Sequence, residues 1–117
     1  MEGASALGAR KCAGQACCVA VEKAMHAVII EETGGPEKLK YAELKEPSAD
    51  AGQVVVKIAA SGVNFIDTYY RTGLYKIDLP AVLGSEGAGT VAAVGPDVEG
   101  LIRGDRVAFA NVRGTYA

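Results

Sequence analysis

The sequence predicts a mainly β domain with one short helix, and three features support this. Fifteen glycines are distributed along the 117 residues, as turn and bulge residues of a sheet are. Short runs of β-favouring residues alternate with turn signals, of which the clearest are Gly-Gly-Pro at 34–36 and Gly-Pro at 95–96. A helix is indicated only between Asn64, a good N-cap, and Gly73, a good C-cap. A chain of this length predicts a single domain.

The strands are expected where apolar and β-branched residues recur between turns. The segments are 25–30, 38–44, 53–60, 90–94 and 106–109, and the tail at 115–117 has the character of a further strand. The clearest is 53–60, because Val54, Val56 and Ile58 fall on one face. His26 has no nucleophile or carboxylate at catalytic spacing, which indicates a structural or solvent-facing residue.

Three glycines in the last third of the chain do not form a phosphate-binding loop. Gly84, Gly87 and Gly89 follow the order G-x-x-G-x-G, whereas a dinucleotide loop needs G-x-G-x-x-G between a strand and a helix. The residues that follow, 90–94, favour a strand instead of a helix. We therefore expect these glycines to shape a sheet.

Residues 1–23 are expected to be a flexible extension, and residues 24–117 to be the folded domain. The extension has no sustained hydrophobic period, and it holds all three cysteines, Cys12, Cys17 and Cys18. Their spacing fits neither a disulfide framework nor a zinc site, which favours reduced thiols in a cytoplasmic protein. A mitochondrial targeting segment is the weaker alternative, since the basic residues are few, and a cloning extension is also open.

Charge and hydropathy argue against two classes of partner. Twelve Lys and Arg residues against fourteen Asp and Glu residues give a formal net charge of −2, which leaves no basic field for nucleic acid. No run of about 18 apolar residues occurs, so no membrane-spanning helix is expected.

Three blocks of sequence carry a family resemblance. These are SGVNFIDTYYRTGLY at 61–75, LGSEGAGTVAAVG at 83–95 and GDRVAFA at 104–110. In their order and spacing they resemble the medium-chain dehydrogenase/reductase superfamily, and more closely its zinc-independent, ζ-crystallin-like quinone oxidoreductase branch. The resemblance implies a GroES-like, partly open β-barrel that partners a nucleotide-binding Rossmann domain. Because no G-x-G-x-x-G loop is present, we expect an N-terminal fragment that is inactive by itself.

Two departures from the zinc enzymes of the superfamily imply metal-free chemistry. Asn64 stands where those enzymes have a cysteine ligand, and Ser85 stands where they have a histidine ligand. Neither side chain is a good zinc ligand, and only Glu86 of that neighbourhood is kept. The resemblance therefore implies hydride transfer from NADPH to a quinone without zinc. It also implies that the complete protein is a homo-oligomer.

The resemblance also implies three site residues. Asn64 and Tyr69 would face the nicotinamide end of NADPH, and Tyr75 would lie near the quinone. An amide with donor and acceptor groups and two flat rings with hydroxyls suit planar ligands, although Asn64 as a simple helix cap and the tyrosines as partial core are alternatives. Asp67 is expected to be structural, in the first turn of the helix. A non-catalytic structural or interaction module is the alternative function.

Overall fold

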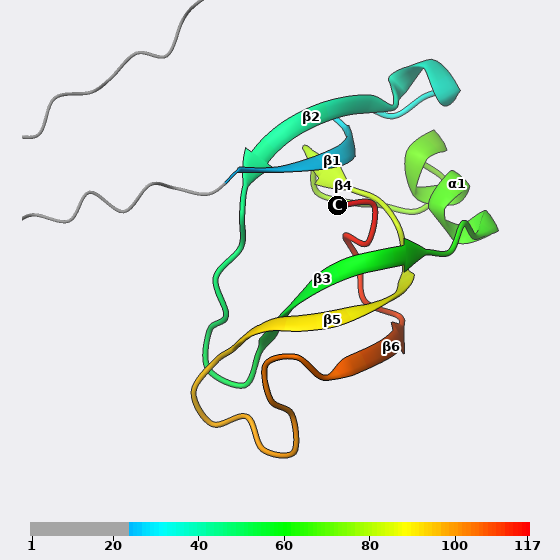
Figure 1. Ribbon diagram of the computed structural model, residues 1–117. Coiled ribbons are helices and arrows are strands. Elements are labelled where there is room, and N and C mark those ends of the chain that lie inside the picture. Colours follow the sequence, from blue (N-terminus) through cyan, green and yellow to red (C-terminus); the bar gives the residue numbers. More distant parts are fainter. Residues whose placement is uncertain (1–23) are drawn as a thin grey trace, which may run out of the picture.

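The computed structural model describes residues 24–117, and this part of the chain is mainly β, as the sequence predicts (Figure 1). Its elements are β1 (Ala24–Ile30), a 3₁₀ turn η1 (Pro36–Lys38), β2 (Lys40–Lys45), β3 (Val54–Ser61), α1 (Phe65–Thr72), β4 (Ala81–Val82), β5 (Glu86–Val94) and β6 (Arg106–Ala110). The extension at 1–23 and its three cysteines lie outside the described residues.

The strands form two three-stranded antiparallel sheets, in the orders β2-β1-β4 and β3-β5-β6. Both sheets are open, so the expected partly open barrel takes the form of two sheets without closure over residues 24–117. Among residues 24–117 five apolar residues are buried and form the core, mostly from β1: Ala27, Ile29, Ile30, Leu83 and Val91. Figure 1 shows α1 beyond the end of β3, beside the turn between β1 and β2.

Helix α1 begins and ends where its capping residues predict. Asn64 is the N-cap in extended conformation, and Gly73 ends the helix in the left-handed conformation with φ of 85°. Arg71 fixes the helix to the β1–β2 turn, since its guanidinium donates to the Gly34 carbonyl at 2.7 Å. The Gly34 N–H donates in return to the Arg71 carbonyl at 2.9 Å. The limits of α1 are therefore set by its two capping residues, and its position is fixed by the two hydrogen bonds between Arg71 and Gly34.

Strand β5 begins four residues earlier than the sequence predicts, at Glu86, and includes two glycines. At Gly89 a Cβ atom would lie 2.1 Å from the Lys57 carbonyl oxygen, so only glycine allows β3 to approach this closely. The pairing of β3 with β5 also shifts register between Ile58 and Ala60. The prediction that these glycines shape a sheet is confirmed for Gly87 and Gly89, whereas Gly84 lies before β5 in a connection. The predicted boundary was wrong because glycine lowers β propensity without preventing a strand.

The predicted strand at 115–117 is wrong, because Thr115, Tyr116 and Ala117 form no regular ladder. Asn111 and Gly114 before it have φ of 62° and 96°, which interrupts an extended run. The segment still joins distant elements. The Tyr116 N–H donates to the Leu83 carbonyl at 3.0 Å, and the Tyr116 carbonyl accepts from the Val28 N–H at 2.8 Å.

Ala81 and Val82 form the short strand β4, which pairs with β1 and was not predicted as a separate strand. His26 is exposed and stacks on Tyr41 of β2, with ring centroids 5.1 Å apart, which agrees with its expected solvent-facing role.

Candidate functional site

The N-terminus of α1 fixes the first predicted site residue, Asn64. Its side chain is half-buried, and its backbone N–H donates to the Asp67 Oδ2 atom at 3.0 Å. The Asp67 N–H donates to the Asn64 carbonyl at 3.1 Å. The N–H group of an N-cap residue has no partner within the helix, and a carboxylate three residues later can accept from it. The two hydrogen bonds between Asn64 and Asp67 therefore hold the backbone of Asn64 in place.

Asp67 is only 5% exposed, and a second donor reaches it from the end of the chain. The Tyr116 hydroxyl donates to Asp67 Oδ2 at 3.0 Å. Burial raises the pKa of the Tyr116 phenol to about 12, and the hydrogen bond to Asp67 and its negative charge act in the same direction. The expectation that Asp67 is structural agrees with this geometry, which links α1 to residues 49 positions later.

The raised pKa of Tyr116 predicts a loss of stability at high pH. A tyrosine has a pKa of about 10 in an unfolded chain, so the neutral phenol stabilises the fold fully below that pH. The contribution is lost as the pH rises through about 10 toward the folded value of about 12. We expect the free energy of unfolding, measured by urea denaturation, to fall over this range more steeply for the natural chain than for Tyr116→Phe. Parallel profiles for the two proteins would contradict the assignment.

The other two predicted residues meet in a group of three aromatic rings, Tyr69, Tyr70 and Tyr75, which we call the tyrosine cluster. The Tyr69 and Tyr75 rings pack edge to face, with centroids 5.5 Å apart, and Tyr70 packs on Tyr75 at 5.8 Å. Tyr69 and Tyr75 remain 37% and 46% exposed, so their rings are available to a ligand. No hydrogen bond joins Asn64 to these rings among the interactions of residues 24–117.

One member of the tyrosine cluster, Tyr70, and one residue that contacts it, Arg113, were not predicted from the sequence. Tyr70 follows Tyr69 directly, and this second adjacent tyrosine was the sequence feature that could have indicated a further ring at the site. The guanidinium of Arg113 lies over the Tyr70 ring, 5.2 Å from its centroid. No local pattern could reveal Arg113, because it lies 43 positions after its ring partner.

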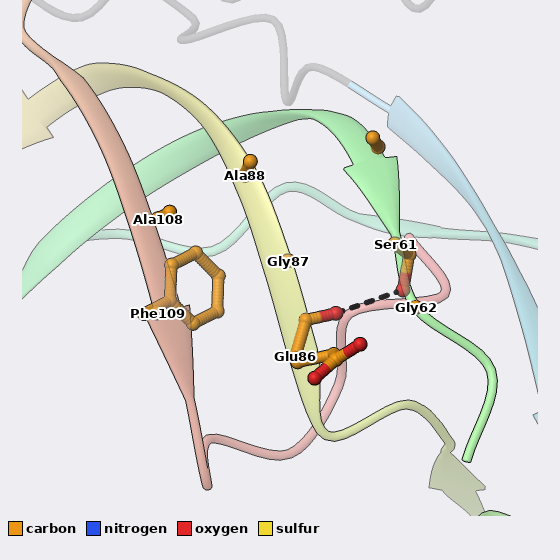
Figure 2. A pocket seen from close by; sticks show the side chains of 8 residues that line it. Ser61, Gly62, Glu86, Gly87, Ala88, Ala108 and Phe109 are labelled. Carbon is orange, nitrogen blue, oxygen red and sulfur yellow. Dashed lines mark hydrogen bonds between the residues drawn. The ribbon is translucent and has the colours of Figure 1, made fainter.

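An open hollow of about 400 Å³ lies on the β3-β5-β6 sheet, and none of the predicted site residues lines it (Figure 2). It is lined by Ala60, Ser61, Gly62, Glu86, Gly87, Ala88, Ala108 and Phe109. The Ser61 hydroxyl donates to the Glu86 carbonyl at 3.2 Å, and the Glu86 side chain lies against Gly62. The Ser61 and Thr115 hydroxyls are 2.7 Å apart. This hydrogen bonding fixes the end of β3 just before Asn64.

No group of three or more His, Cys, Asp and Glu side chains is arranged to hold a metal ion within residues 24–117. No helix in the same range is long and apolar enough to cross a membrane.

Comparison with known proteins agrees with the fold and the sequence blocks. Residues 50–116 match the family described as the alcohol dehydrogenase GroES-like domain. The chain is 53% identical over 78 residues to a quinone oxidoreductase of Pseudomonas aeruginosa, covering 66% of this chain and 24% of that protein. It is 42% identical over 100 residues to a quinone oxidoreductase of Rattus norvegicus, covering 82% and 30% respectively. The Escherichia coli quinone oxidoreductase complexed with NADPH superposes with a TM-score of 0.77 at 39% identity, over 80% of this chain and 29% of that chain.

The chain therefore belongs to the alcohol dehydrogenase GroES-like domain family, which is the class that the two open sheets and α1 define. Within the medium-chain dehydrogenase/reductase superfamily it falls in the quinone oxidoreductase branch, as its three sequence blocks predict. It spans less than a third of the length of these relatives.

Proposed function

We propose that this chain forms one wall of the cofactor and quinone cleft of an NADPH-dependent quinone oxidoreductase. The observation that carries the proposal is the contact between Tyr69 and Tyr75, two exposed rings that the family resemblance assigned to ligands. Similarity to quinone oxidoreductases, one of them complexed with NADPH, supports it. In this proposal a Rossmann domain outside the 117 residues binds most of the cofactor, and the chain alone is inactive.

The residues at hand fit a nicotinamide and a planar acceptor. The Asn64 amide offers a donor and an acceptor at a fixed helix N-cap, and the Tyr69 ring offers an apolar edge with a hydroxyl. Together they would orient the nicotinamide end of NADPH, which supplies the hydride when bound. Tyr75 would position the quinone, since its ring packs against Tyr69 and is partly exposed. The role of these residues is positioning and exclusion of water.

The reaction that we propose needs no zinc. Asn64 and Ser85 occupy the positions of two metal ligands in the zinc enzymes of the superfamily, and neither is a good ligand for zinc. The Ser85 carbonyl accepts from the Val112 N–H at 3.3 Å, so the backbone at this position serves the fold. Stoichiometric zinc in a metal analysis would contradict the metal-free proposal. The complete enzyme would be a cytoplasmic homo-oligomer.

Activity and binding assays test the two parts of the proposal separately. We expect the 117-residue chain to oxidise NADPH with a small quinone no faster than buffer does. We also expect NADPH to shift the NMR signals of the Asn64 amide and the Tyr69 ring. Tyr41 is the internal control, because it is 75% exposed on β2 and stacks on His26. Robust turnover would contradict the requirement for a second domain, and equal shifts at Tyr41 and Tyr69 would contradict the site.

Exposed apolar side chains around α1 favour a second candidate, a non-catalytic interaction module. Val63, Phe65 and Leu74 are 85%, 83% and 67% exposed, which is unusual for a group of large apolar residues. A partner could cover them in a structural assembly that performs no reaction. A discrete oligomer in sedimentation, without any NADPH-dependent NMR shift, would favour this candidate over the enzyme.

A further inference from the structure

Arg113 is fixed beside the segment that contains Ser85, although it is far from the tyrosine cluster in sequence. The N–H groups on either side of it are both bonded: Val112 donates to the Ser85 carbonyl at 3.3 Å, and Gly114 donates to the Gly84 carbonyl at 3.0 Å. Gly84 leaves no room for a side chain here, since a Cβ atom would lie 2.2 Å from the Thr115 hydroxyl. The backbone of Arg113 is therefore anchored on both sides.

The side chain of Arg113 extends to the tyrosine cluster. Its guanidinium lies 5.2 Å from the Tyr70 centroid, and the Tyr70 ring packs on Tyr75. A guanidinium held over an aromatic face keeps N–H groups at its edge for an anion. Arg113 thus places a positive charge over Tyr70, the ring that packs against the proposed acceptor platform, Tyr75.

Neighbouring charges do not neutralise Arg113. Within residues 24–117, no carboxylate forms an ion pair with Arg113, whereas Lys38 pairs with Glu32 and Lys40 pairs with Glu31. Lys76 and Asp78 are both exposed in the loop after Tyr75, and their opposite charges leave no net charge there. The guanidinium of Arg113 is therefore the charge beside the tyrosine cluster that would attract an anionic group on the ligand.

We infer that Arg113 is a specificity-determining residue that makes the site prefer planar acceptors bearing a carboxylate or sulfonate over neutral ones. The inference rests on the proposed function, since it takes Tyr75 as the acceptor platform. With the acceptor ring on Tyr75, the guanidinium would donate hydrogen bonds to the anionic substituent. Because Arg113 is exposed, the solvent screens this attraction, so the expected preference is about five- to tenfold in affinity.

Binding of two matched probes tests this inference. Naphthoquinone sulfonate and naphthoquinone are titrated into the 117-residue chain, and the NMR signals of Tyr69 and Tyr75 report the affinity for each probe. We expect the sulfonate to bind about five- to tenfold more tightly, and Arg113→Gln to abolish the difference. Arg113→Lys, which keeps the charge without the planar fork, should retain only part of it. The preference should also weaken as salt is raised.

Arg103→Gln provides the matched control, because Arg103 is exposed in the β5–β6 connection, at the end of the sheet away from α1 (Figure 1). It makes the same change in net charge and should leave the preference intact. If Arg113→Gln and Arg103→Gln behave alike, or if both probes bind the natural chain equally, the inference is wrong and the proposed site stands. If neither probe shifts Tyr69 or Tyr75, the acceptor site itself is wrong, and the inference falls with it.

Discussion

Replacement of Asp67 by alanine is expected to lower the free energy of unfolding by about 3 kcal/mol, because two donors would lose one buried acceptor. The Asp67 carboxylate is 5% exposed and accepts from the Asn64 N–H and from the Tyr116 hydroxyl, each at 3.0 Å. Each donor left without a partner away from water costs about 1–3 kcal/mol. Urea denaturation of the 117-residue chain, followed by circular dichroism, measures the change.

Two further variants separate the contributions at Asp67. Asp78→Ala is the matched control, since Asp78 is exposed in the loop after Tyr75, and its effect should stay within about 0.5 kcal/mol. Tyr116→Phe removes one of the two donors together with its hydrogen bond, so it should cost about 1 kcal/mol. A loss for Asp67→Ala no larger than that for Asp78→Ala would show that the buried carboxylate does not hold the fold.

The same carboxylate links stability to the proposed site. Asp67 accepts from the backbone N–H of Asn64, so its loss would free the N-cap residue that is expected to orient the nicotinamide. NADPH-dependent shifts at Asn64 should therefore weaken in Asp67→Ala, even under conditions where the chain remains folded. This makes Asp67 a positioning residue in the proposed enzyme.

Local patterns in the sequence were sufficient for most of the fold. The helix was predicted because Asn64 and Gly73 act on residues beside them, and β3 was predicted from alternating apolar residues. The start of β5 was missed because the glycines there are required by the close approach of Lys57 on another strand. Such contacts between strands leave no periodic signal.

The candidate site was predicted only in part, because some of its contacts join residues that are far apart in the sequence. Tyr69 and Tyr75 lie in one block, and their proximity follows from a helix of two turns ending at Gly73. In contrast, the contacts of Tyr116 with Asp67 and of Arg113 with Tyr70 span more than forty residues, and they depend on how the C-terminal segment crosses Leu83. Propensity and capping rules act over a few residues, so they cannot predict such pairs.

Replacement of Gly89 by alanine is expected to be as disruptive as the loss of Asp67, at about 3 kcal/mol. The added Cβ would lie 2.1 Å from the Lys57 carbonyl oxygen and 2.9 Å from its carbon, and both atoms belong to the backbone of β3. Backbone atoms cannot move aside as the end of a flexible side chain can. The strands β3 and β5 would therefore have to move apart near the position where their register shifts.

Gly87→Ala is the control for this prediction, because Gly87 lies two residues earlier in β5 and also needs no positive φ. Its added Cβ would meet Phe109 and Ile58 side-chain atoms at 3.3 and 3.4 Å, and the Ala60 oxygen at 3.4 Å, which small shifts can accommodate. Since alanine also restricts the unfolded chain more than glycine does, the change in the free energy of unfolding should stay within about 1 kcal/mol. Equal losses for the two variants would show that general glycine preference, and not the approach of β3 at Gly89, decides the packing of this sheet.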